Sequence, residues 1–177
     1  MGQPDVADPR ADVARRRAVH GDLRRGQWVP HPEGAAILGP GSFETLGAGC
    51  AGSLPRATLT ASAPPRLGAT AVVRIDNLPL AAAIVALGTD ATSSGLGPLP
   101  LELSAFGLPG CTLRVAPEVM LFVQGTAGHA DIAVTIPPTP TLVGWTLHLQ
   151  ALVLDPQAGN ALGAALSDAA TAVIGPS

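Results

Sequence analysis

Glycine and proline interrupt this chain too often for long helices to form. Of the 177 residues, 21 are glycine and 18 are proline. Proline removes a backbone donor and fixes φ, and glycine inside a helix is destabilising, so both residue types end regular helices. The stretches between these breaks are short and apolar. This punctuation predicts many short strands joined by turns.

Many of these stretches alternate apolar with polar residues, which is the pattern of a strand that buries one face. In the clearest, 129–136, the residues Ala130, Ile132 and Val134 fall on one side. The run 80–88 is apolar throughout and is expected to be buried on both faces. The remaining strands are expected at 57–62, 69–75, 101–107, 109–117, 119–123, 145–155 and 166–174.

Eight or nine strands, each with one apolar face, favour two antiparallel sheets packed against each other. We therefore predict an all-β fold over residues 42–177, a two-sheet antiparallel β-sandwich of immunoglobulin-like or jelly-roll topology. Valine, isoleucine and leucine would fill the core, with alanine as a thin spacer. The length suits one domain of this kind.

Residues 1–41 differ in composition, because they combine prolines with mixed charges and few large apolar residues. We expect a charged, proline-rich tail or linker that is mostly disordered. An alternative is a nucleic-acid arm built on Arg15–Arg17, with Trp28 as a stacking residue. The net charge of −3 gives no basis for nucleic-acid binding. The polar start of the chain shows no apolar core of a secretory signal peptide.

The chain has two cysteines, Cys50 in GAGCAG and Cys111 in PGCTLRVAP. A disulfide between them would close a loop of about 60 residues, contribute about 4 kcal/mol of stability and indicate an oxidising compartment. This is the interpretation we favour. Two buried free thiols are the main alternative. A metal site lacks a C-x-x-C pair, and a catalytic cysteine with His129 or His148 lacks a local nucleophile signature.

The other candidates for chemistry are weaker. The acidic residues fall mostly in turns and lack the D-x-D-x-D spacing of a calcium loop, so we expect solvated turn acids and no metal or other cofactor. Trp145 is expected to pack in the core or at a sheet edge. The segment 41–45, GSFET, is not the G-x-S-x-G of a nucleophile elbow. The acids in question are Asp76, Asp90, Glu102, Asp131, Asp155 and Asp168.

Several motifs in one order resemble a module that recurs at the C-terminal end of secreted proteins of planctomycetes, myxobacteria and related bacteria. The likeness covers about residues 43–175. It implies an extracellular β-rich module and no catalytic residues to carry over. The motifs are GAGCAG at 47–52, IDNLP at 75–79, PLPLEL at 98–103, GLPGCTLRVAP at 107–117 and QALVLDP at 150–156.

We therefore expect a non-catalytic, extracellular or cell-surface module with a structural or adhesive role in packing, display or assembly. Its partners would be neighbouring protein domains or copies of itself, with no nucleic acid and no membrane insertion. The alternative is a ligand-binding module for a glycan or calcium. The loops 89–100 and 155–163 would shape that site.

Overall fold

The computed structural model describes residues 22–24, 27–29 and 39–177. Contacts divide the chain into two compact units, and the first is Met1–Ile37. Its described part is a pair of short antiparallel strands, β1 (Asp22–Arg24) and β2 (Gln27–Val29), which the sequence did not predict. The other residues of the predicted tail up to residue 38, Arg15–Arg17 among them, lie outside the described residues.

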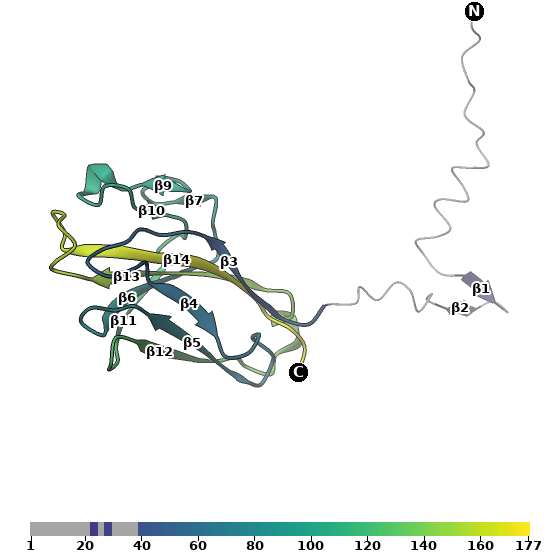
Figure 1. The fold of residues 1–177 in the computed structure, drawn as a ribbon. Coiled ribbons are helices and arrows are strands. Elements are labelled where there is room, and N and C mark those ends of the chain that lie inside the picture. Colours follow the sequence, from purple (N-terminus) through teal and green to yellow (C-terminus); the bar gives the residue numbers. More distant parts are fainter. Residues whose placement is uncertain (1–21, 25–26, 30–38) are drawn as a thin grey trace, which may run out of the picture. The chain divides into compact units, whose positions relative to one another are not determined.

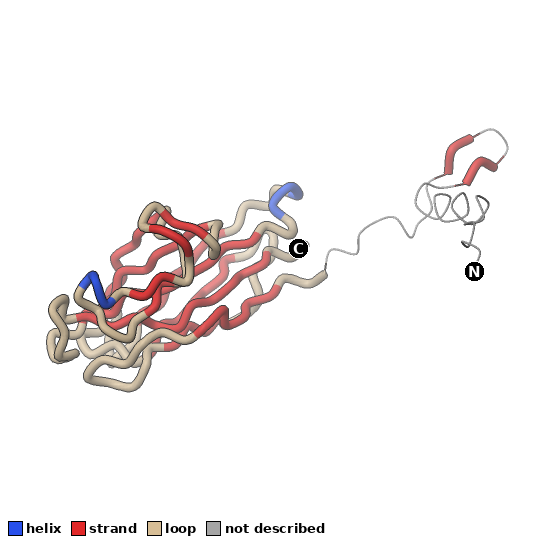
Figure 2. Tube along the Cα trace, turned by 90° about the horizontal axis from the view of Figure 1, so that it is seen from above, coloured by secondary structure: helices blue, strands red, loops and turns tan. Residues whose placement is uncertain are grey.

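The second unit, Leu38–Ser177, is built from antiparallel strands. Its largest sheet has the strand order β11-β6-β13-β14-β3, and a smaller sheet has the order β12-β5-β4. The five strands of the first are β3 (Ser42–Gly47), β6 (Ala82–Gly88), β11 (Val119–Gln124), β13 (Thr146–Leu154) and β14 (Ala164–Val173). The three strands of the second are β4 (Thr58–Ala61), β5 (Thr70–Asp76) and β12 (Ala130–Thr135). Figure 2 shows these strands running alongside one another. The described residues contain no α-helix, so the all-β prediction is confirmed.

Side chains from both sheets share one hydrophobic core. Because side chains alternate along a strand, Leu149, Ala151 and Val153 of β13 all lie on the face that meets the smaller sheet. Val73 and Ile75 of β5 belong to the same buried cluster. Fully burying one such aliphatic side chain stabilises by about 1.5–3 kcal/mol. Figure 1 shows the resulting layers, with β13, β14 and β3 on one side and β4, β5 and β12 on the other.

A further segment, 89–117, lies between β6 and β11 in the sequence and folds over the outer face of β13 and β14 (Figure 1). It has its own buried cluster, in which Leu103, Leu108 and Leu113 pack with Leu166 of β14. The larger sheet is therefore covered on both faces in this region. The segment contains the strands β7 (Ser93–Ser94), β8 (Gly97–Pro98), β9 (Leu101–Glu102) and β10 (Thr112–Leu113) and the 3-10 helix η2 (Ser104–Phe106), and a second 3-10 helix, η3 (Pro140–Leu142), precedes β13.

Two predicted strands in this segment are much shorter than expected. The predicted strand 101–107 stops after two residues at β9, and the predicted strand 109–117 is reduced to β10. Gly107 and Gly110 both have positive φ, 83° and 74°, which breaks an extended chain. The unit contains twelve described strands, β3 to β14, so the predicted count of eight or nine is too low.

Candidate functional site

The two cysteines form the disulfide that the sequence analysis favoured, with Cα atoms 4.9 Å apart. Cys50 touches both hydrophobic clusters, and Cys111 is buried in the outer one. The backbone N–H of Leu166 donates to Cys50 Sγ at 3.1 Å. The bond therefore ties the segment 89–117 to the larger sheet. Neither sulfur is a free thiol, so the free-thiol, metal-ligand and nucleophile alternatives for these cysteines are wrong.

Asp155 is a buried carboxylate at the start of the predicted loop 155–163. It accepts hydrogen bonds from the Ser53 backbone N–H at 2.6 Å, the Ser53 hydroxyl at 2.8 Å and the Gln157 N–H at 3.1 Å. Burial opposes the ionisation of this carboxyl. The three hydrogen bonds outweigh burial and hold the pKa of Asp155 below its usual value.

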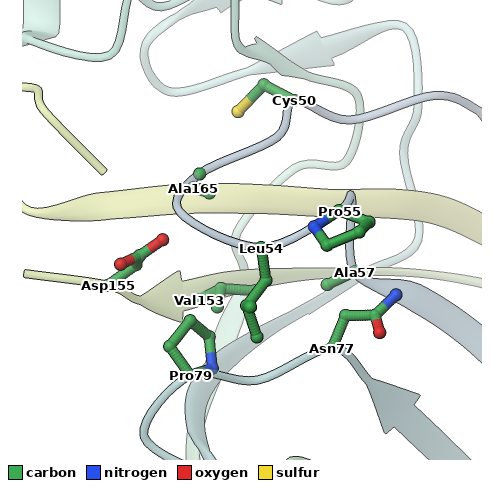
Figure 3. Close-up of a pocket in the computed structure, with 10 residues that line it drawn as sticks. Cys50, Leu54, Pro55, Ala57, Asn77, Pro79, Val153, Asp155 and Ala165 are labelled. Carbon is green, nitrogen blue, oxygen red and sulfur yellow. The ribbon is translucent and has the colours of Figure 1, made fainter. Parts of the chain in front are cut away.

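Figure 3 shows this carboxylate beside a small pocket that Leu54 and Pro79 also line. The cavity measures about 10 Å³, close to the smallest that holds one water molecule. A Cβ atom at Gly52 would overlap Asp155 Oδ2, so only glycine lets the backbone approach so closely. The arrangement fixes the chain before β4 against the end of β13. Its carboxylate accepts all three of these hydrogen bonds.

Asp90, in the other predicted loop at 89–100, is likewise engaged within its own turn. Its Oδ1 accepts the N–H and the hydroxyl of Thr92, both at 2.6 Å, and its Oδ2 accepts the Ser93 hydroxyl at 2.7 Å. These hydrogen bonds, from the Thr92 hydroxyl above all, hold the pKa of Asp90 well below its usual value.

The two predicted loops start at opposite ends of β13. Gly88, just before the first loop, pairs with His148 near the start of β13, whereas Asp155 follows the end of that strand. The separation amounts to about 20 Å of extended strand. The structure therefore does not place Asp90 and Asp155 side by side.

The remaining predicted acids also stand apart from one another. Glu102 accepts hydrogen bonds from Ser104, which lower its pKa, and Asp131 forms an exposed ion pair with Arg74 at 3.1 Å. Burial raises the pKa of the Asp168 carboxyl. No group of three or more histidine, cysteine, aspartate or glutamate residues in the described part of the chain is placed to hold a metal ion.

The histidine and tryptophan candidates do not form a site either. His148 Nδ1 lies 3.0 Å from the Thr171 hydroxyl on the neighbouring strand, and both cysteines are oxidised, so no cysteine–histidine pair exists. Trp145 immediately precedes β13 and is 55% exposed, so of the expected core or edge packing, the core position is wrong.

The strand β11 carries a feature that the sequence analysis missed. The run 119–123 does form a strand, but it is an edge strand that pairs only with β6 among the described strands. The described residues include eleven exposed large hydrophobic residues, and four of them are consecutive in β11: Val119, Met120, Leu121 and Phe122. The signal in the sequence was five consecutive large apolar residues, which alternation arguments assign to a buried position.

A second missed feature is an apolar cavity of about 270 Å³ between the two sheets. Fifteen residues line it, and none of them carries a polar side chain. They come from every strand of both sheets or from residues next to those strands. The lining residues are Phe43, Ala61, Ala63, Pro65, Ala71, Val73, Leu87, Val119, Leu121, Val134, Ile136, Leu147, Leu149, Ala172 and Ile174. The sequence pattern indicates which face of a strand each side chain lies on. It does not give the distance between the two sheets, so this cavity could not be predicted.

No described helix has both the length and the apolar character needed to cross a bilayer. Comparisons of the chain with protein-family models, with curated proteins and with solved structures found no match.

Proposed function

We propose that the second unit is a non-catalytic, extracellular β-sandwich module that associates with a second copy of itself through strand β11. The observation that carries this proposal is the exposed apolar edge Val119–Phe122. Self-association would give the module a structural role in assembly or display. The two-layer arrangement with one shared core supports a β-sandwich, and strand edges on such folds are natural docking points.

The disulfide supports the extracellular part of the proposal. Disulfides form and persist in oxidising environments and are rare where thiols are kept reduced. The bond between Cys50 and Cys111 holds a covering segment in place, which suits a module that works outside the reducing interior of a cell. A binding or structural role is supported by the two loop acids, because Asp90 is hydrogen-bonded within its own turn and Asp155 is held by Ser53 from the segment before β4.

The composition of β11 supports strand-to-strand association. Natural proteins protect edge strands with charges, prolines or very short lengths. The edge strands β3 and β12 follow that rule with Glu44 and Asp131, and β4 has only four residues. β11, with the sequence VMLFVQ, has six residues and neither a charge nor a proline. Its backbone and side chains are therefore available to another strand.

The geometry favours a second copy as the partner. Two β11 strands that pair antiparallel across a two-fold axis present the same residues to each other, so one sequence serves both sides of the interface. Met120 and Phe122 lie on the outer face of the sheet, opposite the cavity-facing Leu121. Pairing would extend the five-stranded sheet into a continuous ten-stranded one.

Analytical ultracentrifugation of the full chain tests the proposal. We expect a concentration-dependent dimer for the unmodified protein and a monomer for Phe122→Lys, because a charge on the exposed outer face opposes pairing. The matched control is Leu162→Lys, since Leu162 is exposed to a similar extent, 57% against 63%, but lies in the loop after β13. That control is expected to dimerise normally. A monomeric unmodified protein, or a Phe122→Lys variant that dimerises like the control, would contradict the proposal.

A further inference from the structure

The space between the sheets is filled at one end and hollow at the other. At the filled end, the chain crosses between the layers at 77–81 and at 125–129, where Leu78 N–H donates to Gly128 O at 2.8 Å. The cavity lies at the other end, near the start of β11 and the end of β12. There Gly175 N–H donates to Pro65 O at 2.9 Å, which joins the layers on the β3 and β4 side.

The large side chains of the lining are most exposed along β11, and Ala63 after β4 is a further exposed lining residue. Val119 and Leu121 line the cavity and are 51% and 39% exposed, whereas Leu149, Ala172 and Ile174 deeper in the lining are buried. The cavity therefore has a solvent-accessible mouth and a buried apolar interior. A ligand can enter between the two edge strands without unfolding either sheet.

The chemistry of the walls restricts the ligand. No wall residue offers a side-chain hydrogen bond or charge. Apolar cavities of this kind exclude water and accept apolar molecules, as an engineered cavity of about 150 Å³ does with benzene. The cavity here is nearly twice as large, at about 270 Å³. A sugar, a metal ion or a charged group would lose its hydration without compensation in such a space.

The shape of the cavity favours a straight chain over a ring system. Its lining runs from Leu121 on the edge strand β11 to Phe43 on the opposite edge strand β3. Four strand spacings separate these strands, which corresponds to about 19 Å. Because the volume is modest and the cavity extends across the width of the sheet, the cavity must be narrow. An unbranched hydrocarbon chain fits a narrow cavity of this length.

We propose that this cavity binds a single unbranched aliphatic chain, with the polar end of the ligand left in solvent at the mouth between β11 and β12. The inference shares strand β11 with the proposed self-association, because Val119 and Leu121 line the cavity and belong to the exposed edge, but separate variants test the two proposals. Phe122 lies on the opposite face of β11 and does not line the cavity, so Phe122→Lys tests association alone.

Titration of the full chain with dodecanoate and with dodecanol, each below its aggregation concentration, tests the proposal by calorimetry. Because no wall residue contacts the polar end, the acid and the alcohol are expected to bind with affinities within a few-fold of each other. Across a series from octanol to dodecanol, affinity is expected to rise about fourfold with each added methylene group. No binding of either compound, or binding of the acid alone, would overturn the proposal.

Cavity-filling variants locate the site. Ala172→Leu on β14 and Ala71→Leu on β5 enter the cavity from opposite sheets, and each is expected to weaken dodecanol binding at least tenfold. The matched control is Ala133→Leu, on the exposed outer face of β12, which is expected to leave affinity unchanged. Using two independent variants guards against the misfolding of one. Wild-type affinity in both folded variants contradicts the cavity as the site.

Methyl nuclear magnetic resonance provides the direct readout. On addition of dodecanol, the methyl signals of Ala61, Ala71 and Ala172 are expected to shift, because these residues line the cavity. The signals of Ala83 and Ala151 in the filled end are expected to stay in place. Shifts confined to Met120, on the outer face of β11, would show that the chain binds the exposed strand and not the cavity.

Discussion

The filled and hollow ends of the inter-sheet layer use the same kinds of residue with different results. At the filled end, Ile75 and Leu78 are fully buried, and Val153 is 2% exposed. At the hollow end, Val134 and Leu147 are only partly buried around the cavity. The two ends differ in how the chain connects the layers, since 77–81 and 125–129 cross between the sheets at the filled end, whereas 136–145 crosses from β12 to β13 at the hollow end.

The comparison shows that hydrophobic patterning alone does not produce close packing. Leu121 and Val85 face the same interior from neighbouring strands, but only Val85 has partners on all sides. Folding therefore depends heavily on the filled end, and the hollow end is left available for a ligand.

Removing the disulfide should produce the largest effect, because the bond holds the covering segment 89–117 against the larger sheet. The double variant Cys50→Ala with Cys111→Ala is expected to lose about 4 kcal/mol of unfolding free energy, since the bond closes a loop of 61 residues. Urea denaturation of the oxidised protein and of the variant measures the difference. A loss below about 1 kcal/mol would mean that the covering segment is held without the bond.

Truncating one side chain at each end tests the comparison directly. Ile75→Ala is expected to cost about 2–5 kcal/mol, because a fully buried side chain leaves a void behind it. Leu121→Ala is expected to cost less than half as much, because its side chain is partly exposed and already faces open space. Urea titrations of both variants provide the measurement, and equal costs would remove the distinction between the two ends.

The pH dependence of the unfolding free energy tests whether Asp155 stabilises the filled end. Its folded-state pKa is lowered, so the unfolded state binds the proton more tightly. Its contribution to stability is present above the unfolded value of about 3.9 and is lost as the pH falls through the folded value. Asp155→Asn should therefore flatten the dependence of unfolding free energy on pH below about 4. An unchanged slope in this variant would count against the Ser53 hydrogen bonds as the cause.

Asp168 should contribute to the pH dependence of the unfolding free energy with the opposite sign to Asp155. Burial raises its folded-state pKa, so the native state binds the proton more tightly and the ionised carboxylate reduces stability. Its unfavourable contribution appears as the pH rises from the unfolded value through the folded one. Asp168→Asn is expected to make the rise of stability with pH steeper just above pH 4, measured in the same urea series. A flattened rise would show that the Leu59 hydrogen bond dominates instead.

Filling the hollow end should have the smallest effect on stability. Ala172→Leu adds apolar atoms where space already exists, so the unfolding free energy is expected to stay the same or rise by about 1 kcal/mol. The same substitution at the filled end, Ala151→Leu, is expected to destabilise by about 1–3 kcal/mol through overpacking. Thermal unfolding of the two variants measures both. Equal destabilisation would show that the space near Ala172 closes in solution.

Five of the longer strands were predicted, because alternation or an unbroken apolar run reports burial, whereas β3 (Ser42–Gly47) was not predicted. The strands β5, β6, β12, β13 and β14 all lie close to their predicted ranges. The segment 89–117 was predicted poorly, since its strands are only two residues long and too short for any periodicity to be detected. The pairing of Cys50 with Cys111 was accessible, because the chain offers only two cysteines.

The cavity and the exposed edge could not be predicted for a different physical reason. The face of the sheet on which a side chain lies follows from local alternation. Whether a strand is at the edge of its sheet, and how far apart the two sheets lie, depend on which strands pair. Strand pairing is non-local. The run Val119–Val123 reads as a buried strand until its place at the end of the order β11-β6-β13 is known. Likewise, Ala71 and Ala172 each look like ordinary core spacers, and only their approach from opposite sheets leaves a void.

The segment 89–117 departs from β6 and returns to β11, and these two strands are paired neighbours, with Leu87 opposite Val119. The whole excursion therefore occupies the place of a hairpin turn. The inter-sheet core contains no residue from within it. A chain of this design can exchange its outer cover for another of different length or chemistry, provided that the two ends still meet. Diversity among such modules would concentrate there, and a short linker grafted between Gly88 and Glu118 of a chain without the two cysteines would yield the minimal scaffold.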